Sequence, residues 1–134
     1  MQTLNLKNPE TLVKKYEQIV CEAEPVKNVE RGGSDLRKLD EAGTNLEFVI
    51  TYTYKPGRFS KEKTVIAVIP VERMGNGVFT GDVSRVVFRS LSYNKGNFEE
   101  EWSGGLGEAK TRFPEIVKAF EEDVKALTEM LSKA

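Results

Sequence analysis

The sequence of 134 residues contains no histidine. Imidazole is the most common general base in enzymes and the most common ligand of protein-bound zinc, so its absence removes both roles. Catalytic triads of the Ser-His-Asp and Cys-His kinds are excluded as well. Carboxylates, lysine or bound magnesium still offer routes to catalysis, but the composition favours a protein that binds over one that catalyses.

Cysteine and long apolar runs are also scarce. Cys21 is the only cysteine, which rules out an internal disulfide and a Cys-x-x-Cys metal site. No run of about 18 apolar residues is present, so the sequence predicts no membrane-spanning helix. The first residues, MQTLNLKNPE, lack the basic and then apolar pattern of a signal peptide. We therefore expect a cytoplasmic protein without a cofactor or a bound metal.

The apolar content is sufficient for one core. The length and the 39% of apolar residues fit a single domain over residues 1–134. Glutamate and lysine are frequent, with 17 and 13 residues, whereas glutamine occurs only twice. This bias is typical of proteins from thermophiles.

The net charge of −1 conceals an uneven distribution along the chain. Residues 51–97 carry eight basic and three acidic side chains, whereas the segments on both sides are acidic. A basic centre favours a polyanionic partner such as a nucleic acid. The alternative is that these basic side chains protect the exposed edges of a sheet from pairing with other chains.

The N-terminal part predicts a helix, an irregular segment and a strand. Asn8 followed by proline is typical of a helix start, and apolar residues continue at helical spacing up to Glu24. Residues 26–45 contain several glycines and no clear period, so we expect a mobile surface segment. Over residues 46–54 apolar and polar residues alternate, which indicates a strand.

Three further strands and a helix complete the predicted fold. The β-branched run over residues 64–69 indicates a strand buried on both faces. Strands over residues 84–93 and 98–102 are joined by a turn at residues 94–97, and a helix follows over residues 111–133. The order predicts an α+β fold with a sheet of about four antiparallel strands, an N-terminal helix and a long C-terminal amphipathic helix.

The C-terminal helix carries apolar residues at alternating spacings of four and three, which we name the heptad stripe. It consists of Phe113, Val117, Phe120, Val124, Leu127 and Leu131. A core helix lying on the sheet explains this stripe. A dimer through its residues from Val117 to Leu131 explains it too, since coiled coils have the same spacing. The two interpretations coexist if the distal half of the helix projects beyond the sheet.

The predicted third strand offers a row of basic and aromatic side chains. One interpretation directs Val86 and Phe88 toward the helices. Arg85, Arg89 and Tyr93 then lie together on the open face of the sheet. Arginines beside an aromatic ring suit the phosphates and bases of a single strand. Ion pairs with acidic residues on neighbouring strands are the alternative.

Aromatic and basic residues also alternate in the turn after the first strand. Phe59 at this exposed tip either stacks on a base or folds back onto its own hairpin. We expect phosphates at the basic residues and bases at the aromatic ones. The predicted nucleic-acid contacts are Tyr54, Lys55, Arg58, Phe59, Arg73, Arg85, Arg89, Tyr93 and Trp102.

Two other motifs give little support to catalysis. Glycines precede the last helix, but Ala109 stands where a Walker loop needs a glycine directly before the lysine. The carboxylates of Glu99–Glu101 alternate between the two faces of a strand. They are therefore more consistent with a charged sheet edge than with a magnesium site.

The element order and the heptad stripe resemble the small archaeal single-stranded DNA-binding proteins called ThermoDBP and their relatives. The resemblance extends over the whole chain, and it implies a sheet cleft that holds the strand and a C-terminal zipper that assembles subunits. We therefore expect a non-catalytic homodimer that binds single-stranded DNA or RNA. The first alternative is a scaffold module that binds another protein through its C-terminal helix, and an enzyme using carboxylates and magnesium is a third possibility.

Overall fold

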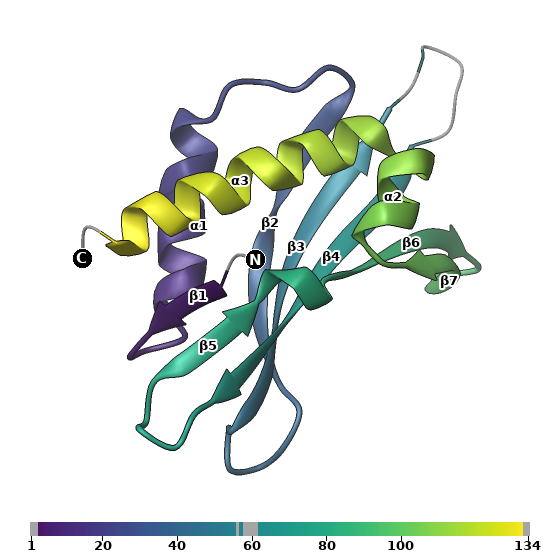
Figure 1. Cartoon of the computed structure of the whole chain (residues 1–134). Helices are drawn as coiled ribbons and strands as arrows, with labels where there is room; N and C mark the ends of the chain where they lie inside the picture. Colours follow the sequence, from purple (N-terminus) through teal and green to yellow (C-terminus); the bar gives the residue numbers. More distant parts are fainter. Residues whose placement is uncertain (1–2, 56, 58–61, 133–134) are drawn as a thin grey trace.

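The fold is seen in a computed structural model, which describes residues 3–55, 57 and 62–132, with the backbone alone at residues 93 and 94. It is an α+β fold, as the sequence predicts, with an N-terminal helix and a long C-terminal one (Figure 1). The elements are β1 (Thr3–Leu6), α1 (Thr11–Glu22), β2 (Val29–Lys38), β3 (Asn45–Tyr54), β4 (Lys63–Arg73), β5 (Phe79–Asp82), the 3₁₀ helix η1 (Val83–Arg85), β6 (Val87–Asn94), β7 (Asn97–Gly104), α2 (Leu106–Arg112) and α3 (Pro114–Ser132). The described sheet has seven strands, so the expected number of about four is too low.

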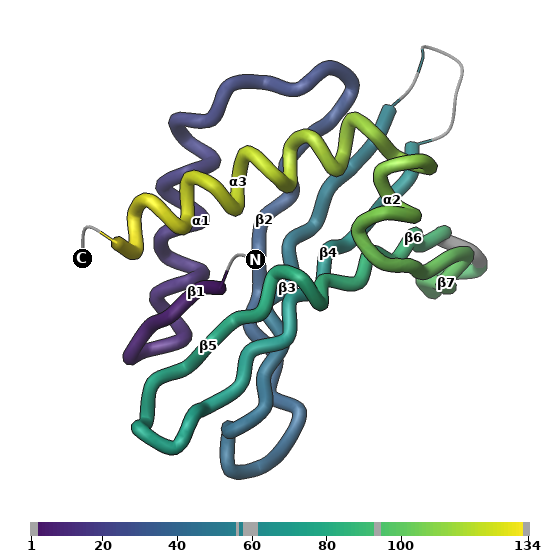
Figure 2. Tube along the Cα trace, in the orientation of Figure 1, coloured from purple at the N-terminus to yellow at the C-terminus, as the bar shows by residue number. Residues whose placement is uncertain are grey.

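The strands form one antiparallel sheet around β4. Its main order is β1-β5-β4-β3-β2, and β6 pairs with both β4 and β7. One half of β4 pairs with β6 at residues 64–68, and its end pairs with β5 at residues 71–73. Figure 2 shows how the chain diverges from β4 toward these two neighbours. The central position of β4 explains why residues 65–69 of the predicted run are buried on both faces, whereas Thr64 at its start is half-buried.

Two helices cover one face of the sheet. α3 crosses the sheet and packs beside α1, and both helices contact β2 (Figure 1). Alternate residues of β3, among them Phe48, Ile50 and Tyr52, face these helices and join the main core. The intervening Val49 belongs to a smaller cluster on the opposite face. The period of two predicted for β3 is therefore confirmed.

Three strands were not expected from the sequence. β2 occupies part of the segment 26–45, which the sequence analysis takes for a mobile surface segment. It lies at the sheet edge, and a bulge between Arg31 and Gly33 breaks its period of two. β1 and β5 have four residues each, too few to establish a period.

Several expected boundaries shift. Arg85 lies in η1, because the Asp82 side chain accepts a hydrogen bond from the Ser84 amide and starts a helical turn. β6 consequently begins at Val87. The expectation that Arg85 and Arg89 share one strand is therefore wrong. α1 begins at Thr11 and not at residue 9. The Asn8 side chain accepts a hydrogen bond from the Glu10 amide in the turn that precedes the helix. The C-terminal helix over residues 111–133 is divided into α2 and α3.

The heptad stripe faces the chain's own core. Its residues Val117, Phe120, Val124 and Leu127 are buried, and Leu131 packs partly buried against the same core. Phe120 meets the ring of Phe88 edge to face at 5.0 Å between centroids. The core-helix interpretation is therefore correct. The predicted dimer contact is wrong for the four buried side chains, because the sheet already occupies that face of the helix.

Among the described residues, no helix has the length and apolar character needed to cross a membrane.

Candidate functional site

A buried carboxylate on α3 joins four elements of the fold. Asp123 is fully buried (0% exposed). Its Oδ2 accepts hydrogen bonds from the hydroxyls of Tyr52 at 2.7 Å and Tyr16 at 3.2 Å. Arg31 Nε lies 2.9 Å from Oδ1 and 3.1 Å from Oδ2. The four residues come from α3, β3, α1 and β2, so this group, here named the Asp123 cluster, fixes the helices to the sheet.

The bulge in β2 brings Arg31 into the Asp123 cluster. Arg31 pairs with Tyr52, but Gly33 pairs with Thr51, so Gly32 is the additional residue. A Cβ atom at Gly32 would approach the Thr51 carbonyl oxygen to 3.2 Å, and Gly33 has a φ of 122°. Glycine suits both positions because it permits the close approach and the positive φ.

The Arg31 guanidinium is only partly satisfied. Its side chain is 6% exposed, and Nη1 donates to the Glu24 carbonyl at 3.1 Å. Nη2 lies 3.7 Å from Glu122 Oε2, which is too long for a hydrogen bond. Within the described part of the chain, Nη2 has no hydrogen-bond partner. A buried donor of this kind favours an additional acceptor.

Burial sets the protonation of the Asp123 cluster. It raises the pKa of Asp123 above the usual range, against the hydrogen bonds from Tyr52 and Arg31, which lower it. Burial also raises the pKa of Tyr52 and of Tyr16, and the neighbouring Asp123 charge adds to both shifts. Both tyrosines therefore stay protonated and donate to the carboxylate at neutral pH.

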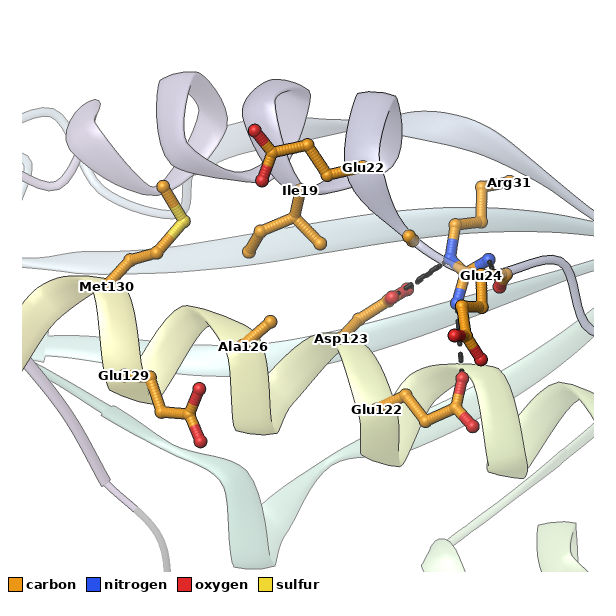
Figure 3. A pocket seen from close by; sticks show the side chains of 10 residues that line it. Ile19, Glu22, Glu24, Arg31, Glu122, Asp123, Ala126, Glu129 and Met130 are labelled. Carbon is orange, nitrogen blue, oxygen red and sulfur yellow. Dashed lines mark hydrogen bonds and ion pairs between the residues drawn. The ribbon is translucent and has the colours of Figure 1, made fainter.

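A pocket of about 390 Å³ opens beside the Asp123 cluster, between α1 and α3. We name it the α1–α3 pocket. In Figure 3, Ile19 and Met130 lie toward one end, and Arg31 with Asp123 lies toward the other. The lining residues are Ile19, Glu22, Ala23, Glu24, Arg31, Glu122, Asp123, Ala126, Glu129 and Met130. Four of these ten residues are apolar and six are charged, so the pocket offers both an apolar wall and groups that can fix a polar ligand.

The described basic residues among the predicted nucleic-acid contacts lie far apart. Lys55 lies at the end of β3 that pairs with the start of β4, whereas Arg73 ends β4. At about 3.3 Å per residue, the length of β4 separates these two places by roughly 30 Å. Arg85 lies on η1, close to the end of β4 that bears Arg73. The structure thus divides the predicted basic residues between opposite ends of the sheet.

Two of the predicted cations are already paired. Arg89 Nε lies 2.7 Å from Glu100 on β7, and Lys55 Nζ lies 3.0 Å from Glu62 and 3.7 Å from Glu30. The hydrogen bond with Glu62 is the main cause of a raised pKa at Lys55. For Arg89, the alternative of an ion pair with an acidic residue on a neighbouring strand is the one observed.

Two predicted aromatic residues pack on the helix side of the sheet. Tyr54 packs against the main core, and burial, together with the Glu115 carboxylate, raises its pKa. Trp102 meets Phe113 edge to face at 5.7 Å, and the Arg112 guanidinium lies 5.3 Å from the centroid of the Trp102 ring. Trp102 and Arg112 also line a shallow pocket of about 480 Å³ at the molecular surface.

Gly104 permits this position of Trp102. A Cβ atom at Gly104 would lie 2.7 Å from Trp102 Cζ2, which is closer than non-bonded carbon atoms approach.

Three of the predicted nucleic-acid contacts stay predictions. Arg58 and Phe59 lie outside the described residues, and so does the Tyr93 side chain.

Comparison with known protein families, with curated proteins and with solved structures gives no match to this chain. The resemblance to ThermoDBP therefore stays a prediction. In the part of the chain that the structure describes, no group of three or more Asp, Glu or Cys side chains is arranged to hold a metal ion.

The Asp123 cluster was not predicted from the sequence, although the sequence contains one signal for it. Asp123 follows Phe120 by three residues and precedes Leu127 by four, so it falls on the buried face of α3. A carboxylate on such a face needs buried donors. Its partners are 71 to 107 residues away in sequence, and no local pattern identifies them.

Proposed function

We propose that the protein binds a small ligand in the α1–α3 pocket, with a hydrogen-bond acceptor of the ligand on the Arg31 guanidinium. The observation that carries this proposal is the Nη2 atom of Arg31, a buried donor that lacks a hydrogen-bond partner among the described residues and belongs to a side chain that lines the pocket. A concave pocket that joins apolar walls to convergent polar groups, one of them with a shifted pKa, is a general indication of a binding site.

Binding fits the geometry better than catalysis. Asp123 lines the pocket and has a raised pKa, but it is fully buried and accepts hydrogen bonds from three side chains. A general base needs a free lone pair within reach of the substrate proton. The role of Asp123 is therefore to hold Arg31 in place, and Arg31 presents its remaining N–H groups to the ligand.

Chemical-shift mapping tests the pocket. Titration of ¹⁵N-labelled protein with small carboxylates that carry an aliphatic chain, such as 4-methylpentanoate and hexanoate, is expected to shift amide resonances of residues 19–24 and 122–130. Ala126→Leu places a larger side chain in the pocket and is expected to weaken this binding by about tenfold or more. Scattered shifts, or shifts that Ala126→Leu leaves unchanged, would contradict the proposal.

Ala42→Leu is the matched control, because it adds the same side chain at an exposed position outside the pocket. This variant is expected to bind the carboxylates as the original protein does. Thermal unfolding of both variants verifies that each remains folded during the titration.

We propose single-stranded nucleic-acid binding as a second function, in line with the basic centre of the sequence. The observation in its favour is the half-buried Trp102 with Arg112 beside its ring at a shallow pocket. Bases stack on aromatic rings whatever their sequence, and a guanidinium pairs with a phosphate. The contact is local to β7 and α2, unlike the extended sheet surface expected from the sequence.

A fluorescent 20-nucleotide strand, titrated at two salt concentrations, tests this second function. Arg112→Ala is expected to lower the affinity for all sequences alike and to reduce the salt slope by about 0.7. Lys125→Ala, which removes an exposed cation on α3, is the matched control and is expected to change neither. Absence of measurable binding at low salt contradicts the nucleic-acid proposal and leaves the α1–α3 pocket unaffected.

A further inference from the structure

The rim of the α1–α3 pocket is strongly acidic. Glu22 and Glu24 approach it from the end of α1, and Glu122 and Glu129 approach it from α3 (Figure 3). The single lining cation, Arg31, is already balanced by Asp123. The pocket therefore presents an excess of negative charge, and the field of several carboxylates favours a ligand with a positive group.

A purely cationic ligand does not satisfy the pocket. Arg31 Nη2 is a buried donor without a hydrogen-bond partner in the described structure, and a donor requires an acceptor. Polyamines and other simple amines provide no hydrogen-bond acceptor for Nη2. The Glu122 side chain, at 3.7 Å from Nη2 and 48% exposed, is free to turn toward solvent. A ligand carboxylate can take its place beside Nη2.

The apolar walls lie between Arg31 and two of the rim glutamates, Glu22 and Glu129. These two are toward the Met130 end of the pocket, whereas Glu24 and Glu122 lie beside Arg31 (Figure 3). Ile19 and Ala23 on one side and Ala126 and Met130 on the other suit an aliphatic chain. From these features together we infer that the ligand is a basic amino-acid moiety with a free carboxylate, its carboxylate on Arg31, its aliphatic stem along the apolar walls and its cation at the glutamate rim. This inference rests on the proposed function and specifies the ligand class of the same pocket.

A basic amino-acid moiety with a free carboxylate occurs in two kinds of ligand. One is free lysine or arginine, and the other is a peptide whose C-terminal residue is lysine or arginine. Isothermal titration and chemical-shift mapping with four probes separate the required groups and the two sources. The probes are L-lysine, glycyl-glycyl-lysine, norleucine, which lacks the side-chain ammonium, and 1,5-diaminopentane, which lacks the carboxylate. Tighter binding of lysine assigns the free amino acid, and tighter binding of the tripeptide assigns the peptide end.

Lysine or the tripeptide is expected to bind most tightly. Norleucine is expected to bind about two- to fivefold more weakly than lysine, because ion pairs at an exposed rim are weak. The diamine is expected to bind about ten- to a hundredfold more weakly than lysine, because it leaves the buried guanidinium without its acceptor.

Removal of rim charge tests the cation contact in the protein itself. Glu22→Gln with Glu129→Gln is expected to reduce the affinity for lysine toward that for norleucine and to leave norleucine binding nearly unchanged. The matched control, Glu17→Gln with Glu121→Gln, removes two exposed glutamates from the same two helices outside the pocket. This control is expected to retain the preference for lysine.

The outcomes distinguish this inference from the proposed function. Equal affinities for norleucine and lysine overturn the role of the rim, and equal affinities for the diamine and lysine overturn the role of Arg31 as a carboxylate receptor. Absence of binding by all four probes overturns the ligand class. In that case, binding of 4-methylpentanoate in the mapping experiment decides separately whether the pocket is a binding site.

Discussion

Replacing both Val124 and Leu127 by glutamate is expected to unfold the protein. The two side chains are 1% and 0% exposed and belong to the core between α3 and the sheet. A carboxylate forced into such a site without a partner costs several kcal/mol. The cost of two such carboxylates is comparable with the total free energy of unfolding of a domain this size, which is about 5–15 kcal/mol. Far-UV circular dichroism and thermal unfolding measure the loss.

Lys118→Glu with Lys125→Glu provides the matched control. It introduces two glutamates on α3 at exposed positions, and the fold is expected to persist. Light scattering of the Val124→Glu, Leu127→Glu variant measures its oligomeric state and can contradict this prediction. A folded monomer would mean that the heptad stripe faces a second copy of the chain and not the sheet.

The spacing of the heptad stripe alone does not distinguish a core helix from a dimer contact. A dimer and a core helix both need an apolar stripe along one side of the helix, so the spacing from Phe113 to Leu131 fits both. What decides between them is the partner surface, which the rest of the chain supplies. Phe88 on β6, in edge-to-face contact with Phe120, belongs to that surface.

The fold was predictable where its elements are long and regular. The alternation of β3 and the β-branched run of β4 are strong signals, because a half-buried and a fully buried strand each impose a pattern on several consecutive residues. β2 lacks such a pattern, since an edge strand tolerates polar residues and its bulge at Gly32 changes the period. β2 therefore lacks a recognisable pattern, and β1 and β5, with four residues each, are too short to show one.

The candidate site was less accessible to sequence reasoning than the fold. Composition and local spacing reveal exposed cations and aromatic rings, and the predicted contacts were of this kind. The position of Asp123 on the apolar face of α3 marks it in the sequence, but Arg31 resembles an ordinary surface residue. Their contact spans 92 residues and is a product of the tertiary fold.

Replacing Arg31 by methionine is expected to lower the free energy of unfolding by about 3–5 kcal/mol. Methionine retains the aliphatic bulk of arginine but removes its charge, so the buried Asp123 carboxylate keeps only the hydrogen bonds from Tyr16 and Tyr52. The loss of one partner of a buried ion pair is costly, because the remaining charge stays buried. Denaturant unfolding measures the change.

Arg37→Met is the matched control, since Arg37 is an exposed arginine on the same strand, β2, and it is expected to change the stability by less than about 0.5 kcal/mol. Adding Asp123→Asn to Arg31→Met removes the unpaired charge, while the side-chain carbonyl of the introduced asparagine still accepts from the tyrosines. The double variant is therefore expected to be more stable than the sum of the single losses predicts, by about 1–3 kcal/mol. An Arg31→Met variant that loses no more stability than Arg37→Met, together with additive losses in the double variant, would show that the ion pair does not hold α3 to the sheet.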